Sequence, residues 1–312
     1  MTTPSAQTDR FVHDRLPPRD QWPELRYDLP ELRIADQANL VERLLDGAAA
    51  RGWADRPLLR SPQITFTYAE TRERVDRIAN YLVHELKLEP GNRVLLRGGN
   101  SIGMALSWLA VVKAGLIAVA TMPLFRAAEL SKVIDKAQPV AAICDARLLQ
   151  ELEQAQQAFP ALQHVLRFNS PDDPSDLGQL VAHQAATFTA CPTSADDIAL
   201  LAFTSGTTGA PKAVVHTHRD VLAACEAWPR HVLRPTSDDI VTGSPPLAFT
   251  FGLGGLLLFP MWAGASIYYP DANYNPETMV RQMSEQGVTT CYTSPTFYRQ
   301  LAPHMKAIGV PS

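Results

Sequence analysis

Short apolar segments alternate with helix-like segments along much of this chain, and this alternation constrains the fold more than any other feature. In the first half the order is strand, helix, strand, helix, strand, at residues 93–97, 101–114, 117–121, 127–137 and 140–144. Successive strands separated by a helix pair in parallel, and the helices then cover the faces of the sheet. We therefore predict an α/β fold with mostly parallel sheets and helices on both faces.

A second alternating series follows a polar, turn-rich segment at residues 169–197, which is expected to connect two α/β layers on the surface. The expected strands of this series lie at residues 198–203, 213–216, 240–242, 265–268 and 289–292. The domain prediction is a first α/β subdomain at residues 1–195, which includes an N-terminal lead-in, and a second at residues 196–312.

Three elements are predicted before the first series. An amphipathic helix is expected at residues 39–51. A hairpin-like pair of strands follows at residues 57–60 and 63–66. Thr67 and Glu70 have the spacing of a capping box, so another helix is expected to begin there.

The composition is that of an ordinary globular protein. The chain has 312 residues, of which 46% are hydrophobic and 19% charged, and its formal net charge is -4. No block of basic residues stands out, so a nucleic-acid partner is not expected. The four cysteines are far apart and form no CxxC pair, which disfavours a zinc site or a disulfide framework and fits a cytoplasmic location.

Residues 247–269 carry no charge and are numerous enough to cross a bilayer. Several glycines and Pro260 interrupt this stretch, however, so it is better interpreted as a helix, a turn and a short strand. The N-terminal residues lack the apolar stretch of a secretory signal. Neither a membrane span nor a membrane partner is expected.

The most informative motif follows the apolar strand expected at residues 198–203. Glycines let successive backbone N–H groups turn toward one anion, small hydroxyl residues add donors, and a lysine adds positive charge, so the run is suited to polyphosphate. The residues expected to bind phosphate are Thr204, Ser205, Gly206, Thr207, Thr208, Gly209 and Lys212.

This run differs from a Walker A loop, because strand-like residues follow Lys212 and the glycine spacing does not match. Composition alone leaves open an ordinary Gly/Thr turn between two strands. His216 and His218 follow closely, but no third metal ligand is visible, so a metal site is not predicted and metal ligands remain unknown.

The nine consecutive residues 204–212 resemble the phosphate-binding signature of the adenylate-forming superfamily, which includes acyl-CoA ligases, luciferases and the adenylation domains of peptide synthetases. Residues 20–25, 28–32 and 120–126 resemble the branch of 2-aminobenzoate and benzoate CoA ligases. The resemblance implies the layered N-terminal domain of an AMP-dependent synthetase/ligase.

The resemblance also implies the chemistry. In this superfamily the loop holds the β- and γ-phosphates of ATP while a substrate carboxylate attacks the α-phosphorus. Pyrophosphate leaves, and the thiol of CoA then attacks the acyl adenylate. ATP, Mg²⁺ and CoA are thus the implied co-substrates, and a small aromatic carboxylic acid is the implied substrate. Alignment and charge neutralisation carry most of the catalysis. A homo-oligomer is among the expected states.

Residues 245–254 resemble the segment that lines the acid pocket in acyl-CoA ligases. Phe249 would occupy the gate position, and Thr250, Phe251 and Gly252 would continue along the pocket wall. Amino-acid-activating relatives usually carry an Asp where Thr250 stands, which argues against α-amino acids as substrates. Side-chain statistics alone leave open that the two phenylalanines are core residues.

Complete relatives continue with a Tyr-Gly-x-Thr-Glu element, a ribose-binding Asp and a C-terminal lid domain that carries a catalytic Lys, and these are absent from residues 1–312. The sequence is therefore expected to be the N-terminal portion of such a ligase, with no complete catalytic set and no activity alone. The alternative is a non-catalytic module that binds ATP, an aromatic acid or another protein.

Overall fold

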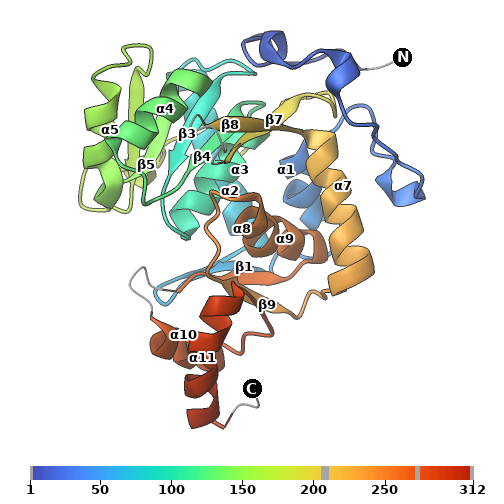
Figure 1. The fold of residues 1–312 in the computed structure, drawn as a ribbon, viewed down its shortest axis with the longest axis vertical. Helices are drawn as coiled ribbons and strands as arrows, with labels where there is room; N and C mark the ends of the chain where they lie inside the picture. Colours follow the sequence, from blue (N-terminus) through green and yellow to red (C-terminus); the bar gives the residue numbers. More distant parts are fainter. Residues whose placement is uncertain (1–2, 205–210, 271–274, 310–312) are drawn as a thin grey trace.

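The computed structural model describes residues 3–204, 211–270 and 275–309, which form two β-sheets with helices between and outside them (Figure 1). The strands of the first sheet, in their order across it, are β6 (His164–Phe168), β5 (Ala141–Asp145), β3 (Arg93–Arg97), β4 (Ile117–Thr121), β7 (Ile198–Thr204) and β8 (Lys212–Thr217). Those of the second sheet are β11 (Thr290–Tyr292), β9 (Ile240–Gly243), β10 (Ser266–Tyr268), β1 (Pro57–Arg60) and β2 (Thr65–Thr67).

The predicted α/β class with mostly parallel sheets is confirmed. Among the described strand pairs, only β7–β8 and β1–β2 run antiparallel. The predicted boundary between residues 195 and 196 does not separate the sheets. β7 and β8 lie in the first sheet, whereas the hairpin of β1 and β2 extends the second sheet beside β10. Each sheet therefore takes strands from both sides of that boundary.

Helices occupy three layers around the two sheets. Between the sheets lie α2 (Tyr68–Asn80), which contacts β1 and β2, and α3 (Ile102–Lys113), which contacts β3, β4 and β5. The buried side chains of this middle layer and both sheets form one large core. On the other face of the first sheet, α4 (Ala127–Ala137) and α5 (Leu149–Gln156) cover a second core. Beyond the second sheet, α10 (Pro276–Glu285) packs on α11 (Pro295–Ala307).

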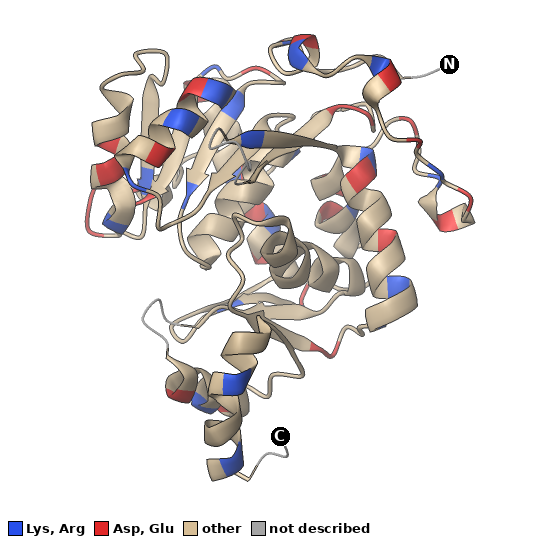
Figure 2. Ribbon diagram, viewed as in Figure 1, with Lys and Arg blue, Asp and Glu red and all other residues tan. Residues whose placement is uncertain are grey.

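The remaining helices complete the middle layer. They are α1 (Leu40–Leu44), α6 (Leu177–Leu180), α7 (His218–Trp228), α8 (Thr250–Leu253) and α9 (Phe259–Ala263), with a wide helical turn, Gly254–Leu258, between the last two. The helix, turn and strand predicted for the uncharged stretch are confirmed, and Figure 2 shows α8 and α9 without a charged residue. Among the described residues, no helix is long and apolar enough to span a bilayer.

Local signals account for the best-predicted elements. Thr67 Oγ1 accepts a hydrogen bond from the N–H of Glu70 at 3.1 Å, and Glu70 Oε2 accepts one from the N–H of Thr67 at 2.8 Å, so the predicted capping box is present. The helix expected at 39–51 was wrong in length. Within residues 39–51, regular α-helix is confined to α1, and a short 3-10 turn follows at Asp46–Ala48.

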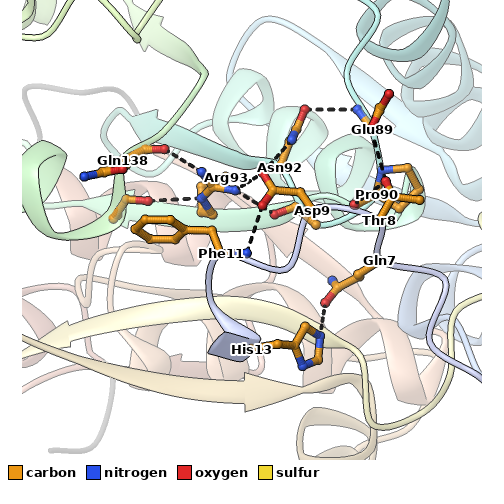
Figure 3. A network of polar contacts seen from close by, with 12 residues as sticks. Gln7, Thr8, Asp9, Phe11, His13, Glu89, Pro90, Asn92, Arg93 and Gln138 are labelled. Carbon is orange, nitrogen blue, oxygen red and sulfur yellow. Dashed lines mark hydrogen bonds and ion pairs between the residues drawn. The ribbon is translucent and has the colours of Figure 1, made fainter. Parts of the chain in front are cut away.

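A network of hydrogen bonds at the amino ends of the first sheet's strands connects the N-terminal residues to the sheet (Figure 3). The carboxylate of Asp9 accepts hydrogen bonds from the buried Arg93 side chain, from Asn92 Nδ2 at 2.8 Å and from the N–H of Phe11 at 2.9 Å. Burial alone would raise the pKa of Asp9, but the bonds from Phe11 and Arg93 hold this pKa below its ordinary value.

Candidate active site

The described ends of the phosphate-binding run lie opposite each other on the β7–β8 hairpin. Thr204 is the last residue of β7 and Lys212 the first of β8, and the two are cross-strand partners. Both side chains are exposed. The structure thus brings the two ends of the predicted loop together at the carboxyl end of β7. The remaining predicted phosphate-binding residues lie outside the described residues: Ser205, Gly206, Thr207, Thr208 and Gly209.

The predicted acid-binding segment follows the carboxyl end of β9 and forms a tight turn into α8. The N–H of Phe249, which is the N-cap of α8, donates to the carbonyl of Pro246 at 2.9 Å. Gly252 lies directly under the same carbonyl, because a Cβ at this position would come within 2.1 Å of the Pro246 oxygen. Backbone packing therefore requires a glycine at this position.

Phe249 and Phe251 are not core residues. Their side chains are 43% and 54% exposed, whereas the neighbouring Gly252 and Leu253 are buried. The Phe251 ring meets the Tyr292 ring edge to face, with centroids 6.1 Å apart and an interplanar angle of 83°. The alternative that these phenylalanines simply fill the core is wrong, and both rings remain available at the surface.

Tyr292, the last residue of β11, was not predicted as a site residue. It is half-buried, and this burial raises the pKa of its hydroxyl. Its ring also covers Gly255, where a Cβ would lie 2.9 Å from the nearest ring carbon. Because β11 and β9 are parallel neighbours, the residues at their carboxyl ends had to lie close together. Once β11 is paired with β9, this register would have identified Tyr292 as a neighbour of the site.

The carboxyl ends of the two sheets meet at this segment. Asn100, just after β3, donates through Nδ2 to the carbonyl of Pro245 at 2.8 Å and accepts through Oδ1 from the N–H of Leu247 at 2.8 Å. Since β3, β4 and β7 are parallel, Thr204 lies on the same edge of the first sheet as Asn100. Ligands of α/β proteins bind outside the carboxyl ends of parallel strands, where both predicted segments lie.

Of the two histidines near the loop, His218 serves the fold. His218 begins α7 and is fully buried, and its Nδ1 accepts a hydrogen bond from the N–H of Leu40 at 3.1 Å. Burial lowers the pKa of His218 to about 3, so the ring is neutral at physiological pH. His216 lies on β8, opposite Leu200. In the described part of the chain, no group of three or more His, Cys, Asp or Glu side chains could hold a metal ion.

The four cysteines are free thiols, and none is activated as a nucleophile. Burial raises the pKa of Cys144 to about 12 and those of Cys191 and Cys291 to about 11. Burial also raises the pKa of Cys225. Thiols with raised pKa values carry little thiolate at neutral pH and react slowly. The site therefore offers backbone, hydroxyl, ammonium and aromatic groups rather than a reactive sulfur.

Comparison with known proteins agrees with this arrangement. The family model described as AMP-binding enzyme matches residues 47–309. The chain belongs to the AMP-binding enzyme family. The match covers both sheets and includes the hairpin of the phosphate run and the acid-binding segment.

Relatives of this chain include ligases for aromatic acids. This chain is 26% identical over 272 residues to the benzoate--CoA ligase of Thauera aromatica, and the alignment covers 87% of this chain and 51% of that protein. The crystal structure of the anthranilate CoA ligase AuaEII in complex with anthranoyl-AMP superposes with a TM-score of 0.80 at 25% identity, covering 87% of this chain and 52% of that one. ATP-bound MatB from Rhodopseudomonas palustris gives a TM-score of 0.75 at 26% identity, covering 85% and 51%. The chain thus spans about half the length of these relatives.

Proposed function

We propose that this chain holds ATP and an aromatic carboxylic acid of the benzoate or 2-aminobenzoate type in an enzyme that converts the acid to its CoA thioester. A carboxylate oxygen of the acid attacks the α-phosphorus of ATP, and pyrophosphate leaves. The sulfur of CoA then attacks the acyl carbon of the adenylate, and AMP leaves. Neither step needs a nucleophile from the protein, in keeping with the raised thiol pKa values at all four cysteines.

The observation that carries this proposal is the pair of exposed phenylalanine rings on the acid-binding segment. Phe251 meets Tyr292 edge to face and is still 54% exposed, and Phe249 stands exposed two residues earlier. Offset stacking between aromatic rings is worth about 0.5–1.5 kcal/mol beyond area burial, which favours a planar ring over an alkyl chain. The benzoate and anthranilate ligases among the relatives support the same acid class.

The phosphate run supplies the other half of the site. Thr204 and Lys212 stand exposed and opposite each other, so their hydroxyl and ammonium groups can donate hydrogen bonds to an anion bound beside them. The lysine adds positive charge where pyrophosphate develops negative charge on departure. Mg²⁺ would accompany ATP as part of the substrate.

Binding measurements on the 312-residue chain test the proposal. With ATP present, saturation-transfer NMR and calorimetry should show benzoate and 2-aminobenzoate binding at least several-fold more tightly than octanoate. Phe251→Ala should remove most of this preference. Trp22→Ala, which deletes another exposed aromatic ring in the N-terminal residues, should leave it unchanged. If octanoate binds more tightly than either aromatic acid, the aromatic assignment is wrong and family membership alone stands.

A further inference from the structure

The turn between β9 and α8 has no regular secondary structure; Phe249 lies at its end as the N-cap of α8, and Phe251 lies in the first turn of that helix. Within it, the N–H of Phe249 is bound to the Pro246 carbonyl, and Gly252 packs under that carbonyl. The direction of both rings therefore follows the position of Pro246. Whatever fixes the peptides on either side of Pro246 therefore also fixes the slot, by which we mean the space beside the Phe249 and Phe251 rings that the acid would occupy.

Asn100 holds both of those peptides. Its side-chain amide donates to the carbonyl of residue 245 and accepts from the N–H of residue 247, both at 2.8 Å, and so clamps the backbone on the two sides of Pro246. One planar amide satisfies a donor and an acceptor at once, in the manner of a strand partner. Asn100 comes from the first sheet, whereas the turn belongs to the second, so this clamp connects the two layers.

The base of this clamp is rigid. Asn100 follows β3, whose five residues are all buried at the centre of the first sheet. It precedes Ser101, the N-cap of α3, whose hydroxyl accepts from the N–H of Met104 at 3.3 Å. The Asn100 backbone thus lies between a central strand, which ends two glycines before it, and a capped helix, which begins two residues after it. Side chains on such supports place a binding group more accurately than a loop can alone.

We propose that Asn100 is a positioning residue for the acid pocket, which it serves by clamping the turn that aims Phe249 and Phe251 at an aromatic carboxylate. The inference rests on the proposed function for the identity of the ligand, but the clamp itself does not depend on it. Aspartate at position 100 would keep the acceptor for Leu247 and lose the donor to Pro245, whereas alanine would lose both. The two variants should therefore differ in degree.

Amide hydrogen exchange on the full 312-residue chain tests the clamp without a ligand. Asn100→Ala should accelerate exchange at Leu247, Phe249 and Leu253 by about tenfold or more, and Asn100→Asp by less, while the amides of β3 and β9 keep their rates. Asn80→Ala is the matched control, because that side chain also holds a distant loop by bonds to two carbonyls, at 2.9 and 3.0 Å. Unchanged exchange at these three amides in both Asn100 variants would overturn the proposal.

Ligand binding then tests the positioning role. Asn100→Ala should weaken benzoate binding by about tenfold while ATP binding changes less than twofold, because the phosphate run extends from β7. Asn80→Ala should leave the ratio of the two affinities unchanged. Equal losses for benzoate and ATP would show a general structural role and contradict the proposal. If Phe251→Ala leaves benzoate binding intact, the proposed function fails instead, and the exchange experiment still decides the clamp.

Discussion

Two pairs of polar residues at opposite ends of the first sheet are used in opposite ways. At the amino ends of its strands, the Asp9 carboxylate and the Arg93 guanidinium are engaged in the hydrogen bonds of the network in Figure 3. Arg93 also donates to the carbonyls of Gly91, Ala137 and Gln138 at 3.1, 3.1 and 2.8 Å. At the carboxyl ends, Thr204 and Lys212 stand exposed.

This difference separates residues that contribute to the stability of the fold from residues that can contribute to ligand binding. A buried charge whose hydrogen bonds are satisfied within the protein contributes to the fold and has little left for a ligand. Exposed donors and exposed aromatic rings contribute little to the fold and keep their interactions for a ligand. Substitutions at Asp9 and Arg93 should therefore reduce stability without altering ligand preference, and substitutions at Thr204 and Lys212 should alter ligand binding with little effect on stability.

The largest effect on stability is expected from Arg93→Met. Methionine keeps much of the apolar stem, but it leaves the partly buried Asp9 carboxylate and several carbonyl groups without their donor. Removing one partner of a buried ion pair costs about 3–5 kcal/mol. Urea unfolding should show a loss of this size, whereas Arg10→Met, at an exposed arginine, should cost less than about 0.5 kcal/mol. Similar losses in the two variants would show that the buried network contributes no more to stability than an exposed arginine does.

An intermediate effect on stability is expected from Gly252→Ala, together with a large effect on binding. The added methyl group would lie 2.1 Å from the Pro246 oxygen, so the turn must shift. Overpacking of this kind costs about 1–3 kcal/mol. The shift should also abolish the preference for benzoate over octanoate. Gly47→Ala, where the nearest atom would be 3.5 Å away, is the control. Retained preference in the Gly252 variant would show that the turn does not set the slot.

Local patterns predicted most of the sheet that carries the phosphate run. The bounds of β3, β4 and α4 agree with the predicted segments, because each is a run with one clear period between turn residues. The edge strand β6 and helix α5 were missed. β6 contains His164 and Arg167, which interrupt the apolar pattern that marks a central strand.

The candidate site was predictable only where it is local. The phosphate run and the acid segment were found because their residues are consecutive. Asn100 contacts Pro245 and Leu247, which lie 145 and 147 positions further along the chain. Phe251 contacts Tyr292, which is brought near it by the pairing of β9 with β11. Side-chain contacts at such separations depend on tertiary packing. The packing of Gly252 against the Pro246 carbonyl was not predictable for the same reason.

A smaller, pH-dependent effect is expected from Asp9→Asn. Because the folded-state pKa of Asp9 lies below its ordinary value, the ionised carboxylate stabilises the fold fully above the unfolded-state pKa near 3.8, and this contribution disappears as pH falls through the lower folded-state pKa. At pH 7 the variant should be less stable by about 1–2 kcal/mol. The difference should shrink steadily below about pH 4. A difference that is constant from pH 7 to pH 3 would exclude the ionised carboxylate as its source.

The smallest effect on stability is expected from Lys212→Ala. The side chain is exposed at the start of the edge strand β8, so its removal should change the free energy of unfolding by less than about 0.5 kcal/mol. Binding of ATP and pyrophosphate should nevertheless weaken by about tenfold, since hydrogen bonds to charged groups are worth about 1.5–3 kcal/mol. Lys132→Ala, on the distant helix α4, is the control. Calorimetry at fixed ionic strength measures both affinities, because screening by salt would otherwise lower them together. If the two lysine variants bind pyrophosphate equally well, the exposed end of β8 has no part in phosphate binding, and the proposed contrast between the two pairs of residues loses its clearest support.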